Sequence, residues 1–544
     1  MSAHFKWYPA SEEVVVPWNA RYSFPSQANK AVKITPRIPP KNGAAFAPGQ
    51  VIRLEFPAQG YVNPLNTTLE FDVTLYGYTT ATAQAVRFQN NIQSIFNRVR
   101  LLYGATPLED MINYNVIVRA LTEWTATDQH MTMDQTSVAE GIGGIVPATD
   151  SAGYAGYVNT RQKYIQGIST TTGVTPNNFS GGASLGVVPQ SSDVPAGITG
   201  SGGTAVTRRY QINFALGLFT QDKLIPTKFM ASQLAIELTL EQANACIYVP
   251  PSCTNTVTGN PTYGVANVNL IPEILEFDAS YDSMFLAGLR DGGVPLKFSS
   301  WHTFIFSSGS AANINLLVQE RSRSVKALFA VQRRAQPTFF TDSHALLFDT
   351  ASNGASTLQN FQFRIGGRYF PAAPVQVSSS VGSAISNGGA EAYVELSKAL
   401  NIVGDYRLST GCNASKWGTQ ATSAGLLQEF DHTYALAGFS SAGVTSLTGI
   451  ESSANAFGGP FASACFAMST DLETSNGVEI SGLNAEEQSD IALIANWKAS
   501  QVTGASQSIN SNTITGGVPS SLEVYSYYDA MIVLRENNVL ELIQ

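Results

Sequence analysis

The chain of 544 residues is too long for one ordinary hydrophobic core, so we expect two or three domains. Aromatic residues make up 10% of it, which excludes a disordered protein, and a net charge of −9 excludes one that coats nucleic acid through bulk positive charge. Only 13% of the residues are charged, and this low content fits a β-rich chain whose surface is largely covered by partners.

The four cysteines are too few for a disulfide framework, and none forms a CxxC pair typical of zinc sites. We interpret them as buried free thiols: Cys246, Cys253, Cys412 and Cys465. The N-terminus lacks the basic and apolar regions of a secretory signal, and no apolar run approaches the roughly 20 residues that cross a bilayer. We therefore expect a soluble protein that is made inside a cell, is not secreted and has no transmembrane segment.

Residues 1–48 are predicted to form a Pro-rich basic N-terminal arm. Prolines from Pro9 to Pro48 forbid a continuous helix or a central strand, and an excess of lysine and arginine over glutamate makes the segment basic. Such an arm would reach toward nucleic acid or a neighbouring subunit, or it would lie as a strap on its own domain. The sequence leaves these alternatives open.

Strands with one apolar face are predicted in quick succession over residues 49–282. Leu69, Phe71 and Val73 alternate with charged or polar residues, as in a strand with one buried face. The predicted strands cover residues 52–56, 69–75, 95–101, 212–218, 234–240 and 269–281. A long segment rich in Gly, Ser and Thr, about 125–206, is predicted to be a loop within this domain.

One element occurs twice: a strand, a Gly/Pro break and an amphipathic helix. The first copy spans Phe88–Trp124, and the second begins at Phe361. The helical spacing falls on Tyr114, Ile117, Leu121 and Trp124 in the first copy and on Tyr393, Leu396, Leu400 and Val403 in the second. Each apolar face is expected to seal the flank of a domain by packing.

The second half of the chain repeats the order of the first. A linker helix is predicted over 283–293, and strands follow over 294–544 around a second Gly/Ser/Thr loop at about 409–462. Each half has about eight alternating strands and no βαβ spacing, which favours antiparallel sheets. Eight antiparallel strands in two packed sheets form a jelly roll. The predicted fold is therefore all-β, mainly antiparallel: two tandem eight-stranded jelly rolls, each with a short flanking helix and long loops.

This organisation resembles the double jelly-roll major capsid proteins. The stretches NPLNTTLEFDVTL (63–75) and FQNNIQSIFNRVRLLYGATPLED (88–110) look most like the branch of polinton-like viruses and virophages, within a family that includes adenovirus hexon. The resemblance implies a homotrimer whose six jelly rolls make a pseudo-hexameric capsomer of an icosahedral shell around a genome. It also implies upright strands, outward loops, and penton and minor capsid proteins as partners in the virion, assembled inside the host cell.

We predict no catalytic, cofactor-binding or metal-binding residue, and no enzyme activity. The five histidines show neither HExxH nor a paired spacing: His4, His130, His302, His344 and His432. GIGGIV (141–146) and GSGGT (200–204) lack the lysine of a phosphate loop and are interpreted as loop glycines. Glu486 and Glu487 precede a strand and are interpreted as solvated carboxylates.

Five basic residues gather around one strand of this acidic chain: Arg321, Arg323, Lys326, Arg333 and Arg334. One interpretation is an inner patch or subunit contact that meets carboxylates or genome phosphates. The other is cross-strand pairing with nearby Asp and Glu, which contributes modestly at a surface. Both interpretations stay open.

Three functions are compatible with these patterns. The favoured one is a capsid subunit that associates through apolar side walls, with the arm and the C-terminal ELIQ tying neighbours or the inner surface. The alternatives are a glycan-binding β-sandwich, lectin-like or adhesin-like, and a carbohydrate-active enzyme. The duplicated helix and the missing signal peptide count against the glycan-binding protein, and no compact motif marks the groove that an enzyme would need.

Overall fold

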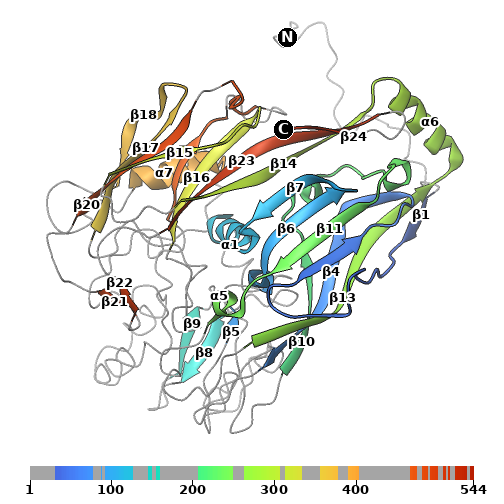
Figure 1. Cartoon of the computed structure of the whole chain (residues 1–544), viewed down its shortest axis with the longest axis horizontal. Helices are drawn as coiled ribbons and strands as arrows, with labels where there is room; N and C mark the ends of the chain where they lie inside the picture. The colour runs from blue at the N-terminus through green and yellow to red at the C-terminus, as the bar shows by residue number, and fades with distance from the viewer. Residues whose placement is uncertain are drawn as a thin grey trace, which may run out of the picture.

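The structure is a computed structural model, and two β-sandwiches joined by one helix make up its framework (Figure 1). The ranges that it describes are 31–76, 87–88, 92–125, 145–149, 155–159, 206–248, 262–306, 313–333, 356–377, 390–402, 466–473, 481–487, 490–499, 507–509, 512–514, 521–535 and 540–544. Among the helices in these ranges, none has the length and apolar character needed to cross a membrane.

The first sandwich consists of a five-stranded and a four-stranded antiparallel sheet, the fifth strand being the two-residue β2 (Ala45–Phe46), which pairs with β13. One sheet has the order β1 (Ala31–Ile34), β13 (Thr262–Phe277), β4 (Tyr61–Tyr76) and β10 (Val206–Asn213). The other has the order β3 (Val51–Glu55), β11 (Leu234–Leu240), β6 (Phe96–Tyr103) and β7 (Thr106–Ile112). Alternate residues such as Leu69, Phe71 and Val73 are fully buried between the sheets, as their period of two predicts.

The second sandwich has the same construction. One sheet has the order β14 (Val294–Phe306), β23 (Ser521–Leu534), β16 (Val325–Arg333) and β19 (Met468–Asp471), and β24 (Leu540–Ile543) pairs with β23 as well. The other has the order β15 (Asn313–Val318), β20 (Ile491–Ala499), β17 (Ser356–Ile365) and β18 (Arg368–Gln376).

The two sandwiches share one strand order. With the additional strands β2 and β24 left out, each sandwich has eight strands. Numbered along the chain, they run first, eighth, third, sixth in one sheet and second, seventh, fourth, fifth in the other. This is the order in which eight antiparallel strands wind into a jelly roll. The prediction of two tandem jelly rolls is therefore confirmed, and we call them roll 1 and roll 2.

The repeated strand–break–helix element is a hairpin followed by a helix. In roll 1 the break is the turn at Gly104 between β6 and β7, and in roll 2 it is the turn at Gly366 and Gly367 between β17 and β18. All three glycines have positive φ, which glycine adopts without steric cost. The helices that follow are α1 (Tyr114–Thr125) and α7 (Ala390–Ala399).

The linker helix is α6 (Ala279–Arg290), which connects β13 of roll 1 to β14 of roll 2. It begins four residues before the predicted 283–293, because the carboxylate of Asp278 accepts a hydrogen bond from the backbone N–H of Tyr281 and caps the first turn. Gly292 and Gly293, both with positive φ, follow its end.

Two sequence predictions are wrong in part. The arm was predicted up to residue 48, but residues 31–34 form β1 and pair with β13 of roll 1. The strand lies at a sheet edge and ends before Pro36, so the prolines do not interrupt it. The strand predicted over 212–218 ends at Asn213, and its last apolar residues belong to the short helix α4 (Gly217–Thr220) and the turn before it.

Several short elements complete the described chain. They are β2 (Ala45–Phe46), β5 (Arg87–Phe88), η2 (Ile92–Ile95), β8 (Ile145–Thr149), β9 (Ala155–Asn159), η4 (Thr227–Phe229), α5 (Ala243–Cys246), β12 (Ile247–Tyr248), β21 (Gln507–Ile509) and β22 (Asn512–Ile514). The hairpin β8–β9 falls within the loop predicted at about 125–206, whose other residues up to 205, like the loop at 409–462, lie outside the described residues. The N-terminal residues 1–30 also lie outside them.

Candidate functional site

The two rolls meet along a seam. On the side of roll 1 it is formed by the edge strand β7 with α1 and α4. On the side of roll 2 it is formed by the edge strand β14 and by β16 of the same sheet. Figure 1 shows α1 between the two sandwiches. The hydroxyl of Thr303 on β14 donates a hydrogen bond of 2.8 Å to the carbonyl of Ile112 at the end of β7. The seam therefore joins two strands that belong to different sheets of different rolls.

A buried carboxylate, Glu109 on β7, lies at the centre of the seam. It accepts hydrogen bonds of 2.8 Å from the backbone N–H groups of Gly217 and Leu218 in α4, and one of 2.7 Å from the hydroxyl of Ser300 on β14. Burial raises the pKa of Glu109, and these three hydrogen bonds oppose the rise. One side chain thus ties together three segments from the two rolls.

Close backbone contact accounts for the glycine at position 217. A Cβ atom there would lie 2.0 Å from the carbonyl oxygen of Ser299 and 2.9 Å from the ring of Phe298, both on β14. Non-bonded atoms do not approach each other this closely, so any side chain at position 217 would force α4 away from β14. Gly217 therefore fixes how closely roll 1 approaches roll 2.

An aromatic contact crosses the seam beside these polar groups. Trp124, at the end of α1, is fully buried and stacks on Phe329 of β16 with 5.0 Å between the ring centroids and 22° between the planes. Trp301 of β14 packs against the same Phe329 at 5.5 Å. Aromatic pairs of this geometry stabilise a contact by about 0.5–1.5 kcal/mol beyond the area that they bury.

The apolar face of α1 was predicted to pack on roll 1 alone, but in the structure part of it contacts roll 2. Tyr114, Ile117 and Trp124 are fully buried as predicted, whereas Leu121 is only partly buried. The face was expected to seal the flank of roll 1, but Trp124 reaches across to roll 2. The sequence pattern identified the apolar side of the helix without showing that another domain covers part of it.

The second predicted helix face packs within its own roll. In α7, Leu396 is fully buried, Tyr393 and Leu400 are partly buried against the core, and Val403 lies outside the described residues. The helix contacts β16, β18 and β19, which all belong to roll 2.

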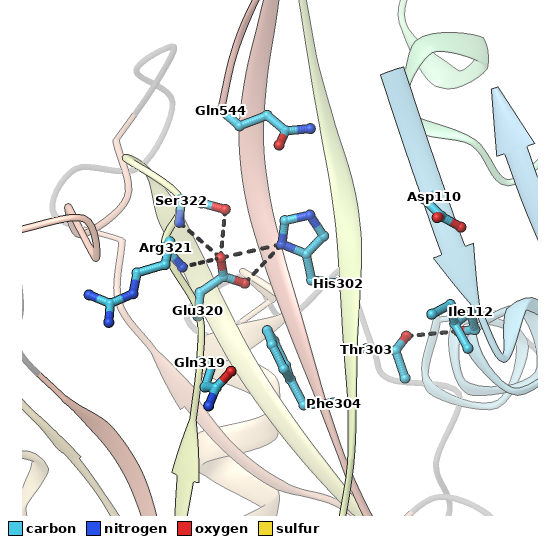
Figure 2. Close-up of a pocket in the computed structure, with 10 residues that line it drawn as sticks. All are labelled: Asp110, Ile112, His302, Thr303, Phe304, Gln319, Glu320, Arg321, Ser322 and Gln544. Atoms are coloured by element: carbon cyan, nitrogen blue, oxygen red, sulfur yellow. Dashed lines mark hydrogen bonds and ion pairs between the residues drawn. The ribbon is translucent and has the colours of Figure 1, made fainter. Parts of the chain in front are cut away.

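A cavity of about 400 Å³ opens at the seam (Figure 2). Its lining comes from the end of β7, from β14, from the segment after β15 and from the C-terminal residue: Asp110, Ile112, His302, Thr303, Phe304, Gln319, Glu320, Arg321, Ser322 and Gln544. Both polar and apolar side chains therefore face it, and both rolls contribute.

The cavity wall contains a buried carboxylate, Glu320, that is paired with the half-buried His302. Nδ1 of His302 lies 3.1 Å from Oε2 of Glu320, and Oε1 of Glu320 accepts from the backbone N–H groups of Arg321 and Ser322 and from the hydroxyl of Ser322. Burial alone would raise the pKa of Glu320, but the hydrogen bond and charge of His302 and the hydroxyl of Ser322 outweigh it and lower the pKa to about 2. The ring of His302 also stacks on Tyr528 at 4.0 Å.

This pair has the geometry of a structural contact. A histidine whose Nδ1 is held by a carboxylate resembles the base of a nucleophile–base pair, but such a pair also needs a nucleophile within reach of the other ring nitrogen. The lining hydroxyl of Ser322 already donates to Glu320, and that of Thr303 to Ile112. No motif in the sequence indicates the pair, because its partners come from two segments that only the fold brings together.

The basic cluster forms ion pairs where its side chains are described. Arg323 lies 2.7 Å from Glu486, and Lys326 lies 3.2 Å from Asp529 and 3.7 Å from Glu473. Lys326 on β16 pairs across strands with Asp529 on β23, and Arg323 pairs with Glu486 between two segments that precede strands. Pairing with nearby carboxylates therefore accounts for these two basic residues. Arg321 is exposed beside the cavity, and Figure 2 shows its guanidinium turned away from His302. The side chain of Arg333 and all of Arg334 lie outside what the structure describes.

The structure describes some of the carboxylates, cysteines and histidines that the sequence analysis singled out. Glu486 and Glu487 are exposed, and Glu486 pairs with Arg323. Cys246 is a buried free thiol as predicted, while the other three cysteines and the four histidines besides His302 lie outside the described residues. Within the described ranges, no three His, Cys, Asp or Glu side chains gather in a way that would hold a metal ion.

Comparison with known proteins gives similarity in structure alone. No protein-family model and no curated protein matches the sequence. The fold is similar to a chain in the cryo-EM structure of the Sputnik virophage, with 11% identity, a TM-score of 0.54, and coverage of 98% of this chain and 92% of that one.

A second solved structure is similar over almost the whole length of both chains. It is VP54 of the virus PBCV-1, fitted into a reconstruction of Sputnik, with 10% identity, a TM-score of 0.50, and coverage of 96% of this chain and 99% of that one. At this identity the similarity concerns the fold, and it extends to both rolls. The chain has the double jelly-roll fold of the major capsid proteins of these viruses.

Proposed function

We propose that this protein is a major capsid protein that trimerises into pseudo-hexameric capsomers and tiles an icosahedral shell around a viral genome. The observation that carries the proposal is the repeated strand order of two rolls held together by a buried seam. The similarity in fold to virophage and PBCV-1 capsid proteins over nearly the whole chain supports it.

The seam suits this role because a capsomer with six similar corners needs two rolls at a fixed relative position. Glu109, Gly217 and Trp124 hold the rolls through a hydrogen-bonded carboxylate, a backbone contact and an aromatic stack. Buried contacts of this kind behave as a domain core and resist relative motion. Three copies of such a rigid pair supply the six corners.

The proposed partners follow from the same role. They are further copies of this chain in the trimer and in neighbouring capsomers, together with penton and minor capsid proteins. Residues 1–30 precede β1 and carry aromatic and basic side chains, so we infer that they contact inner components or the genome. The protein would act in the virion, assembled inside the host cell, as a structural component without enzyme activity.

The experiment that tests the proposal measures the mass and shape of the purified full chain. Multi-angle light scattering should give three times the chain mass, and negative-stain microscopy should show particles with a hexagonal outline or closed shells. A compact monomer at every concentration tested would contradict the proposal, and binding of that monomer to a glycan array would favour the lectin-like alternative.

A further inference from the structure

The described residues leave much of the surface of the linker helix α6 uncovered. Eight of its twelve residues are exposed, and Leu289 alone in the helix is buried. The side that packs on roll 1 is aromatic, since the rings of Tyr281 and Phe285 both lie 5.5 Å from the ring of Tyr61. These contacts account for the position of the helix, and they leave its other side open.

One exposed row of α6 carries no charge. Met284 is 65% exposed, and the residues four positions before and after it on the same face are Ser280 and Gly288. Ala287, three positions after Met284, is exposed as well, and a Cβ placed at Gly288 would meet no described atom within 4 Å. We call these four residues the Met284 row, a shallow and uncharged surface.

The neighbouring row of α6 has the ordinary character of a helix surface in water. Leu286 is 41% exposed, and Asp282 and Arg290 stand four positions before and after it. Charged residues on the outward side are the usual pattern of a helix that faces solvent. The uncharged Met284 row departs from this pattern, and exposed apolar surface of this kind is typical of contact with another segment.

The chain that precedes β1 joins the fold beside this helix. Ala31 pairs with Phe277 and Ile34 pairs with Ile274, so β1 runs antiparallel to β13. Following β1 back toward the N-terminus therefore leads along β13 toward α6, which begins two positions after Phe277. Figure 1 shows β1 and α6 on the same side of roll 1. Residues 1–30 are thus attached next to the Met284 row.

The segment before β1 contains a stretch that complements this surface. Residues 14–18 have the sequence VVVPW, an apolar run without charge. Trp18 lies 13 positions before Ala31, and a chain of this length spans up to about 45 Å when extended. The twelve residues of α6 make a helix only about 18 Å long. The run is therefore able to reach any part of the helix.

We propose that residues 14–18 pack on the Met284 row of α6 in the same chain and hold the N-terminal arm against the linker between the rolls. The contact removes apolar surface of both segments from water, and the short tether to β1 keeps them close at any protein concentration. Residues 1–13 lie beyond the contact and stay available to inner components. The inference goes beyond the proposed function, because a contact within one chain forms in a monomer as well as in a capsid.

Oxidation of Met284 by hydrogen peroxide measures whether the row is covered. The full chain is compared with a shortened chain that lacks residues 1–30 and keeps β1, and peptide mass spectrometry follows the sulfoxide at Met284. Free methionine in the same sample is the reference. Met284 should oxidise about tenfold more slowly in the full chain, the effect of a contact of about 1.4 kcal/mol, and should match free methionine in the shortened chain.

Substitutions in the full chain make the test independent of truncation. Val16→Asp puts a carboxylate in the middle of the apolar run, and burying it against α6 is unfavourable, so Met284 should oxidise as fast as in the shortened chain. Ser26→Asp makes the same change in charge outside the run and should keep the protection. Leu286→Met places a methionine on the charged row, where it should oxidise at the same rate in the full and the shortened chain.

The identity of the covering segment follows from how the protection of Met284 behaves. Protection that stays the same over a dilution series supports the contact within the chain. Protection that is lost on dilution would assign the row to a second copy, and protection that appears only with phosphatidylglycerol vesicles would assign it to a lipid surface. Either result, or equal rates in the full and shortened chains, would overturn this inference. None of them bears on trimer formation, so the inference and the proposed function fail separately.

Discussion

At the scale of single residues, two buried carboxylates at the seam have pKa values that move in opposite directions. Burial is the largest influence on both and raises both. Among the described residues, the donors to Glu109 are two backbone N–H groups and the hydroxyl of Ser300, and its pKa stays raised. Glu320 also has His302 beside it, whose hydrogen bond and charge reverse the effect of burial. The neighbour therefore decides the direction in which the pKa of a buried carboxyl moves.

The lowered pKa of Glu320 predicts a loss of stability in acid. The carboxyl has a pKa of about 2 in the folded chain against an ordinary 4.5, which corresponds to about 3 kcal/mol. Because the folded value is the lower one, this stabilisation is complete above pH 4.5 and is lost as the pH falls toward 2. We expect Glu320→Gln to flatten the decline in the free energy of unfolding over this interval, measured by urea unfolding at a series of pH values.

The control for this prediction is Glu486→Gln, which removes an exposed carboxylate that pairs with Arg323. An exposed ion pair contributes little, so this variant should follow the wild-type pH dependence. Wild-type behaviour in Glu320→Gln as well would show that the His302–Glu320 pair does not contribute to acid stability.

At the scale of elements, α1 has a different role from α7 although both follow the same hairpin. The two helices share an apolar spacing, and each buries part of that face in its own roll. Only α1 carries a tryptophan at its last apolar position, and this ring reaches Phe329 in roll 2. The duplication thus produced two similar elements, one of which also connects the rolls.

Alanine substitutions in α1 should separate the contribution of Trp124 to stability from that of Leu121. Trp124→Ala removes a fully buried ring and should lower the free energy of unfolding by about 3–5 kcal/mol. Leu121→Ala removes a partly buried side chain and should cost less than the about 2–5 kcal/mol of a fully buried leucine. Differential scanning fluorimetry ranks the two variants, and a larger loss in Leu121→Ala would contradict the observed orientation of the helix.

At the scale of the whole molecule, the seam makes two jelly rolls into one rigid unit. Three of its contacts are the hydrogen-bonded carboxylate of Glu109, the aromatic stack of Trp124, and the backbone approach at Gly217. The first two stabilise the seam, and the third sets its distance. If these contacts couple the rolls strongly, the rolls should unfold together.

The glycine at the seam provides a test of this coupling. Gly217→Ala adds a single methyl group where a Cβ would clash with Ser299, so the rolls should separate slightly and the protein should lose about 1–3 kcal/mol. The calorimetric transition of the wild type should be single, and that of the variant should split into two. The control is Gly288→Ala in α6, where a Cβ meets no atom within 4 Å and alanine favours the helix.

An unchanged single transition in Gly217→Ala would show that the close approach of α4 to β14 does not control the coupling. Two transitions in the wild type would show that the rolls are independent of each other despite the seam.

The sequence by itself determined the local structure and its repetition. A period of two in Leu69, Phe71 and Val73, and a helical spacing in Tyr114 and Ile117, follow from backbone geometry that each short segment carries. Because these patterns occur twice in the same order, the sequence alone was enough to predict two jelly rolls. It went wrong at residues 31–34, where nearby prolines suggested an arm and pairing with β13 made a strand.

Only the tertiary structure decided how the two rolls are joined. Glu109 meets Ser300 across 191 positions of the chain, and Trp124 meets Phe329 from another domain. A periodic pattern shows which side of a strand or helix is apolar, but it does not show what covers that side. Contacts between distant segments depend on how complete sheets pack, so the seam and the His302–Glu320 pair became visible only in the folded chain.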